Sequence, residues 1–220
     1  MKQTINLGAY GWQRAHWIES FYPDDLPEDW QLGYYSNEFN TVLVPADYWQ
    51  SKHAEECENW LDDVHQSFQF FIECHSRMLD MISPAELTEA LLILKPQLSG
   101  LVFLGDEPMS SVEKDQFDRL VEDSEAVVFC AEHAFETNAP ETNKIWRPGC
   151  ITDNHARSRF AFIEDDLSDL RSSRELIEPF TTKLNDDEAG DKEATMIVSH
   201  PDLQAADLTK FRSVLEIMGH

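Results

Sequence analysis

Short apolar runs recur along the whole chain, and polar or helix-like segments separate most of them. The runs are nearly continuous rather than alternating, which is typical of parallel strands that are covered on both faces of a sheet. They predict eight strands, at Ile5–Ala9, Thr41–Val44, Phe68–Cys74, Leu101–Leu104, Ala126–Cys130, Ile145–Ile151, Phe160–Ile163 and Ala194–Val198.

Between these runs, apolar residues at helical spacing indicate helices. In the segment 83–86, Ser and Glu three residues apart predict a capping box, and Pro84 suits the first helical position. Later helices are expected to start at Ser110 or Ser111, after Asp166 and around Asp202. Strands that alternate with helices predict an α/β fold, and eight strands in 220 residues fit a compact (β/α)₈ TIM-like barrel in a single domain, residues 1–220.

The charge of the chain restricts its partners. Forty-two Asp and Glu residues against 17 Lys and Arg give a net charge of −25, spread along the chain rather than gathered in a tail. A surface of this sign repels phosphate backbones and anionic membrane leaflets, so we expect no direct nucleic acid binding and no membrane binding. The N-terminus lacks the apolar run of a secretory signal, and the four cysteines lie far apart without a CxxC pair, which predicts a cytoplasmic protein.

The densest pattern lies near the N-terminus, where residues 10–49 hold 11 of the 24 aromatic residues. A Gly-x-x-Gly-Trp turn precedes a second Trp, Phe-Tyr-Pro, Leu-Pro, a Tyr pair and Phe-x-Thr-Val. This order resembles the N-terminal signature of the DUF72 (YecE-like) family, and it implies a TIM-like barrel but no reaction, because the family is largely uncharacterised. The residues that carry it are Gly8, Gly11, Trp12, Trp17, Phe21, Tyr22, Pro23, Leu26, Pro27, Tyr34, Tyr35, Phe39, Thr41 and Val42.

Other parts of the chain depart from the family pattern. The family usually has Glu-x-Asn after the second strand, whereas residues 42–49 of this chain read Val-Leu-Val-Pro-Ala-Asp-Tyr-Trp, so apolar residues replace the polar pair. An Arg-His-Pro after the fifth strand corresponds to residues 131–134, Ala-Glu-His-Ala. The loss of these polar residues motivates the hypothesis of a degenerate, non-catalytic barrel that acts as a binding or regulatory protein.

The carboxyl ends of the strands are where a (β/α)₈ barrel places its site. An acid or a histidine follows seven of the eight predicted strands. Because these residues are common in this chain, chance alone would place about four there, so many belong to a solvated acidic rim under the simpler interpretation. Converging carboxylates and imidazoles would suit a divalent metal ion that activates water or polarises a sugar carbonyl.

The candidate residues divide by role. The catalytic candidates are Glu73, His133 and His200, the ligand-binding candidates are Tyr10, Trp12, Asp106, Glu132 and Glu164, and the metal-ligand candidates are His75 and Asp202. Tyr10 and Trp12 could stack on a sugar ring, or they could pack the barrel and its first loop. The segment 200–202 could be a turn and an N-cap, and the segment 164–166 could be a helix start.

Three functions therefore compete. The first is a metal-assisted enzyme that acts on a small sugar- or phosphate-like ligand at the strand ends. The second is the degenerate barrel, and the third is an acidic mimic of nucleic acid, which only the net charge supports.

Overall fold

The structure is a computed structural model, and it describes residues 4–49, 54–75, 83–105, 110–130, 143–149, 158–186 and 193–220. Its strands follow one another in chain order around a closed eight-stranded barrel, and helices alternate with them. The predicted (β/α)₈ TIM-like fold is confirmed. Among the described residues, no helix combines the length and the apolar character that a membrane span needs.

Each predicted strand has a counterpart in the structure. Two of them, 41–44 and 160–163, match their predictions residue for residue, and all of their residues are buried. The strands are β1 (Thr4–Tyr10), β2 (Thr41–Val44), β3 (Gln69–Cys74), β4 (Leu98–Phe103), β5 (Val128–Cys130), β6 (Asn143–Trp146), β7 (Phe160–Ile163) and β8 (Glu193–Val198).

The helical segments lie between these strands. They are the 3-10 turns η1 (Ala15–Trp17) and η2 (Glu28–Trp30), and the helices α1 (Gln31–Ser36), α2 (Ala46–Trp49), α3 (Ala54–Asp63), α5 (Pro84–Leu94), α6 (Ser111–Ser124), α7 (Leu170–Asp186) and α8 (Ala205–Met218). The start of α6 has a capping box, in which the Glu113 N–H donates to the Ser110 hydroxyl and the Ser110 N–H donates to the Glu113 carboxylate. Ser83 is the N-cap residue of α5, but its side chain makes no capping bond, so the capping box predicted there is wrong.

Two helices begin later than expected because nearby polar residues form turns first. The Asp166 carboxylate accepts hydrogen bonds from the N–H and hydroxyl of Ser168, and α7 starts only after Asp169, which accepts from the Arg171 N–H at 3.1 Å. Residues 200–203 likewise form a turn, and the N-cap of α8 is Gln204 rather than Asp202.

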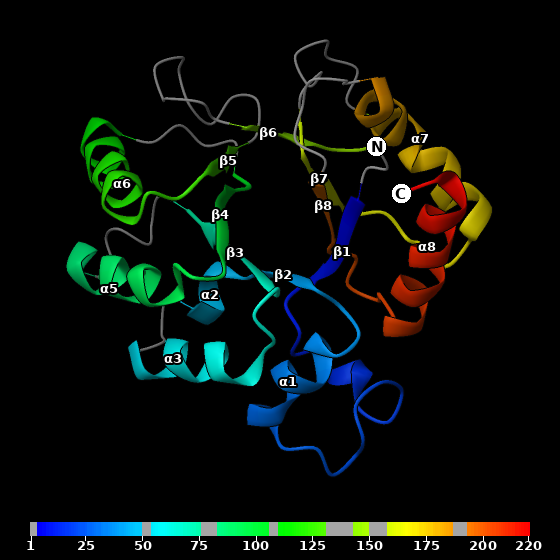
Figure 1. Ribbon diagram of the computed structural model, residues 1–220, viewed down its shortest axis with the longest axis horizontal. Coiled ribbons are helices and arrows are strands. Elements are labelled where there is room, and N and C mark those ends of the chain that lie inside the picture. The colour runs from blue at the N-terminus through cyan, green and yellow to red at the C-terminus, as the bar shows by residue number, and fades with distance from the viewer. Residues whose placement is uncertain are drawn as a thin grey trace. The chain divides into compact units, whose positions relative to one another are not determined.

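Contacts divide the chain into two compact units. Unit 1 comprises Met1–Thr41 and Lys144–His220, and unit 2 comprises Val42–Asn143. In unit 1, β6 pairs with β7, β7 with β8 and β8 with β1, all in parallel, while α8 packs on β1 and α7 packs on α8 (Figure 1). The prediction of one domain stays a prediction.

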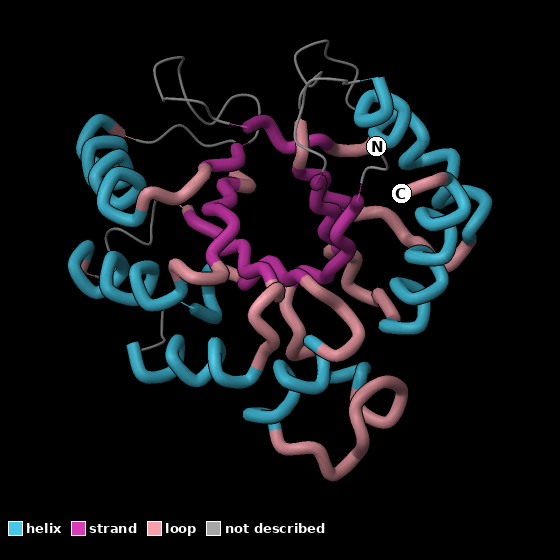
Figure 2. Tube along the Cα trace, in the orientation of Figure 1, coloured by secondary structure: helices cyan, strands magenta, loops and turns pink. Residues whose placement is uncertain are grey.

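In unit 2, β3 pairs with β4 and β4 with β5, again in parallel. The helix α5 lies between α3 and α6 on the outer side of these strands (Figures 1 and 2). In each unit the strands form the inner layer and the helices the outer layer, which explains why the strands are apolar on both faces.

Candidate functional site

In unit 1, residues at the carboxyl ends of β6 and β1 contact the same aromatic ring, that of Phe162 in β7. Arg147 directly follows β6, and its guanidinium lies 5.1 Å from the centre of the Phe162 ring. The same guanidinium donates to the Glu164 carboxylate at 2.5 Å. Tyr10, the last residue of β1, meets Phe162 edge-on with ring centroids 6.1 Å apart. An exposed ion pair and two aromatic rings thus share one small region.

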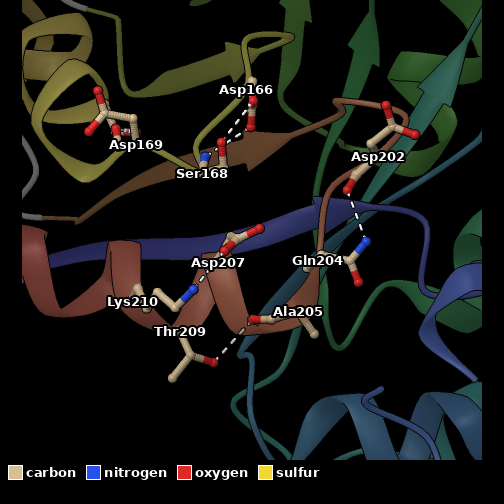
Figure 3. A network of polar contacts seen from close by, with 10 residues as sticks. Asp166, Ser168, Asp169, Asp202, Gln204, Ala205, Asp207, Thr209 and Lys210 are labelled. Carbon is tan, nitrogen blue, oxygen red and sulfur yellow. Dashed lines mark hydrogen bonds and ion pairs between the residues drawn. The ribbon is translucent and has the colours of Figure 1, made fainter. Parts of the chain in front are cut away.

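His200 follows β8 and is half-buried. Its Nδ1 accepts a hydrogen bond from the Asp202 N–H at 3.3 Å, so the neutral imidazole carries its proton on Nε2. In Figure 3 the Asp202 carbonyl accepts from Gln204, and the Asp202 carboxylate points away from that contact. The predicted turn at 200–202 is therefore present, and its hydrogen bonds fix the tautomer of His200.

Asp166 follows β7 and lies close enough to His200 to interact with it electrostatically. Hydrogen bonds from the N–H and hydroxyl of Ser168, drawn in Figure 3, lower the pKa of Asp166, and the charge of His200 lowers it further. The folded state thus favours the ionised form of Asp166. Asp166 belongs to the segment 164–166, for which the sequence allows either a strand-end site or a helix start.

Arg14 connects the loops after β1 and β8. Its guanidinium donates to the carbonyl oxygens of Tyr10 at 3.1 Å and His200 at 2.9 Å, and it lies 5.4 Å from the centre of the Trp17 ring. Burial lowers the pKa of Arg14. Because this contact holds the backbone of both Tyr10 and His200, Arg14 positions two of the candidate residues.

The aromatic residues after β1 are mostly packing residues. Trp12 is 2% exposed, and its carbonyl accepts from the Tyr22 hydroxyl at 2.7 Å. Trp17 is fully buried, and its indole donates to the Leu203 carbonyl at 2.6 Å. Of the two predicted ligand-binding aromatics, only Tyr10 is partly accessible, while Trp12 lies in the packed core.

The candidates in unit 2 hold the backbone together. Glu73 accepts the Ala46 N–H on Oε2 at 2.9 Å, at the start of α2, and its carbonyl accepts from the Trp49 indole at 2.7 Å. His75 is half-buried, and its Nδ1 has no hydrogen-bond partner among the described residues. These contacts give Glu73 a structural role at the end of β3, and its catalytic role stays a prediction.

The remaining predictions concern a metal ion and residues that the structure does not describe. Asp106, Glu132 and His133 lie outside the described residues. Within the described ranges, no group of three His, Cys, Asp or Glu side chains is placed to hold a metal ion. His75 and Asp202 belong to unit 2 and unit 1 respectively, and a metal role for either stays a prediction.

The predicted site contains neither arginine, because the prediction rests on acids, histidines and aromatic residues near the strand ends. Arg147 was also placed inside a strand predicted to reach residue 151. Pro148 was the signal that could have corrected this, since proline is not found in a central strand.

Comparisons with known proteins agree with this fold. Residues 6–96 match the family model of DUF72, described as a protein of unknown function. DUF72 family proteins of known structure from Thermotoga maritima (13% identity, TM-score 0.60) and Enterococcus faecalis (10% identity, TM-score 0.62) each cover 96% or more of both chains. D-psicose 3-epimerase, crystallised in the presence of D-fructose, covers 96% of this chain and 97% of its own (8% identity, TM-score 0.54).

A search of curated protein sequences finds no match. At such low identities the solved structures show the fold alone, and the family model covers the N-terminal part of the chain. The DUF72 resemblance is confirmed: residues 6–96 match the DUF72 family model, and the chain is similar in fold to solved DUF72 proteins, with the closed barrel described above.

Proposed function

We propose that this protein binds a small polyhydroxylated, sugar-like ligand at the strand ends of unit 1. The observation that carries the proposal is that Tyr10 and Arg147 both lie against the Phe162 ring, while Glu164 is bonded to Arg147. Ligand sites of this kind combine apolar surface with a few convergent polar groups, and this region supplies both.

The chemistry of the side chains suits hydroxyl groups. Glu164 offers carboxylate oxygens that accept hydrogen bonds, and Arg147 offers N–H groups that donate them. Glu164 is exposed and Arg147 is half-buried, and ion pairs that solvent reaches contribute little to stability. A ligand hydroxyl can therefore insert between the two side chains at small cost, while Tyr10 contacts the carbon atoms of the ligand.

His200 and Asp166 add further polar groups near these strand ends. The Nε2–H of His200 can donate a hydrogen bond to a ligand oxygen, because its Nδ1 already accepts the Asp202 N–H, and the Asp166 carboxylate can accept hydrogen bonds from ligand hydroxyls. The fold of D-psicose 3-epimerase shows that a barrel of this type can host sugar chemistry, although a shared fold does not by itself transfer an activity.

Binding without turnover is the second candidate function. Two observations favour it: Glu73 accepts the first N–H of α2, and the segment after the second strand lacks the polar pair that the DUF72 resemblance leads us to expect there. Under this interpretation the ligand is recognised at unit 1 and released unchanged.

Thermal unfolding in the presence of D-fructose, D-glucose, myo-inositol and D-glucose 6-phosphate tests the proposal, each with and without Mn²⁺. A ligand at 100 times its Kd stabilises the folded state by about 2.7 kcal/mol, which raises the Tm measurably. We expect this rise in the wild type and in Arg171→Gln, an exposed arginine of α7, and a loss of it in Arg147→Gln. Equal responses of the two variants, or no response of the wild type to any ligand, would contradict the proposal.

Product analysis then separates the two candidates. After incubation with each ligand that raises the Tm, chromatography shows whether the ligand has changed. Turnover that His200→Gln abolishes while the rise in Tm persists would establish an enzyme, and an unchanged ligand would establish a binding protein.

A further inference from the structure

The helix α5 in unit 2 is apolar around most of its circumference. Leu92 is 46% exposed, and Ile93 is half-buried. A helix that is apolar on all sides is typical of one that is covered on all sides. Its inner face is covered, as the burial of Leu87, Ala90, Leu91 and Leu94 shows.

A groove of about 860 Å³ runs along the outer side of α5. Its apolar floor includes Leu92 and Ile93 of α5 and Leu120 of the neighbouring helix α6. The flanks of α5 pack on α3 and α6, so the groove is formed by three helices of one unit. Figure 1 shows these helices side by side on the outer face of unit 2.

The edge of the groove is acidic. Glu58 of α3, Glu89 of α5 and Asp123 of α6 line it, with Arg119 as the cation among the lining residues. None of these three acids forms an ion pair with a described Lys or Arg, whereas Lys95 of the same unit is paired with Glu125. Unit 2 as a whole has 21 acids and 5 bases, so the field at the groove is negative.

We propose that this groove docks a basic amphipathic helix of another protein. The apolar face of that helix would cover Leu92 and Ile93, and its Lys and Arg side chains would face Glu58, Glu89 and Asp123. Charge decides between occupants: a second copy of this chain would bring a net charge of −25 against the same acids, and like charges in an interface oppose association.

The test uses a fluorescent synthetic peptide of about 14 residues, roughly four helical turns, with leucine on one face and lysine on the other. Its partner probe has the same composition in an order that gives no apolar face. We expect the amphipathic peptide to bind the full-length protein at least tenfold more tightly than the reordered peptide, as measured by fluorescence anisotropy. Equal affinities would reduce the interaction to general attraction by the negative chain and overturn the proposal.

Two variants with the same change in charge locate the site. Leu92→Lys places a cation in the groove floor, and Ile217→Lys places one on α8, where Ile217 is 84% exposed. Because both positions are exposed, we expect both variants to fold, which circular dichroism verifies. Leu92→Lys should weaken binding at least tenfold and Ile217→Lys less than twofold, and equal effects would overturn the proposal.

A milder variant and an oligomer measurement complete the test. Glu89→Gln should reduce the dependence of the affinity on salt concentration, because one charge at the groove edge is removed. Sedimentation velocity of the protein alone should show a monomer. A dimer that Leu92→Lys dissociates would mean that a second copy covers the groove, and the proposal would be wrong.

Discussion

Unit 1 contains 21 acidic and 12 basic residues, and unit 2 contains 21 acidic and 5 basic residues. The two units thus carry the same number of acids, and the difference in charge comes from the bases. In unit 1, Arg14 and Arg147 bind backbone carbonyls or a carboxylate at the strand ends. The net charge of −25 is therefore a poor guide to the site, because the arginines organise it.

The two units also use their strand ends differently. At the end of β7 the Glu164 side chain accepts from Arg147, and at the end of β8 His200 accepts the Asp202 N–H on Nδ1 and keeps its Nε2 for a further contact. At the end of β3, one carboxylate oxygen of Glu73 accepts a hydrogen bond from the backbone of α2. A polar residue at the end of a strand therefore contacts a ligand in our proposal for unit 1, whereas in unit 2 it stabilises the local backbone.

The largest expected effect concerns the aromatic core of unit 1. Trp17 stacks on Tyr35 with ring centroids 6.2 Å apart and donates to the Leu203 carbonyl. Trp17→Ala should lower the free energy of unfolding by about 3–5 kcal/mol, the usual cost of removing a buried tryptophan. Urea denaturation followed by circular dichroism measures it.

Trp30 is the matched control, because it lies in the same segment but is 67% exposed. Trp30→Ala should change the free energy of unfolding by less than about 0.5 kcal/mol. If the two variants were equally stable, the aromatic segment would not be the packing core of unit 1.

The next largest expected effect is a difference in stability between alanine substitutions at two glycines, one in each unit. A Cβ on Gly8 of β1 would lie 2.1 Å from the Thr41 carbonyl oxygen, which is backbone and cannot rotate away. A Cβ on Gly105 of unit 2 would meet no atom within 4 Å. Gly8→Ala should cost about 1–3 kcal/mol, and Gly105→Ala should be neutral or stabilise by about 0.4–1 kcal/mol. Thermal unfolding of both variants checks this, and a tolerated Gly8→Ala would mean that the approach at Thr41 is looser than described.

The strands could be predicted because each is a short apolar run whose side chains are buried on both faces of the sheet. Helix starts were less predictable where several capping residues compete: Ser110 caps α6 as expected, but Ser83 does not use its hydroxyl. Before α7, Asp166 lies nearer the strand and forms a turn with Ser168. Asp169 lies directly before the helix and accepts the Arg171 N–H of its first turn.

The site was only partly predictable because its geometry depends on contacts between distant segments. Tyr10, Glu164 and His200 could be found from their places at the strand ends. Arg14 reaches His200 across 186 residues of sequence, and no local pattern indicates such a contact. The groove along α5 was missed for the same reason, since its residues come from three helices.

A smaller change in the free energy of unfolding tests the structural role of Glu73. Glu73→Ala leaves the Ala46 N–H without its acceptor and should cost about 1–2 kcal/mol in the free energy of unfolding. Glu73→Gln keeps an amide oxygen in place and should cost less than about 0.5 kcal/mol. Urea denaturation of both variants decides: equal destabilisation would show that the negative charge, and not the acceptor, matters at this strand end.

The smallest expected effects are two matched pKa changes, one in each unit. The hydroxyl and N–H of Ser110 lower the pKa of Glu113 in unit 2, and Ser168 followed by His200 lowers that of Asp166 in unit 1. A lowered pKa means that the folded state favours the carboxylate. This stabilisation is present above the ordinary pKa and is lost as the pH falls through the folded-state value.

Carbon-detected NMR titration of the two carboxyl groups measures these shifts directly. Ser110→Ala should raise the pKa of Glu113 toward its ordinary value and leave Asp166 unchanged, because its hydroxyl contact is removed. His200→Gln should raise the pKa of Asp166 and leave Glu113 unchanged, because only Asp166 has an imidazole nearby. If His200→Gln left the pKa of Asp166 unchanged, His200 would not act on Asp166 in solution, and the proposed place of Asp166 beside His200 in the ligand site would lose its support.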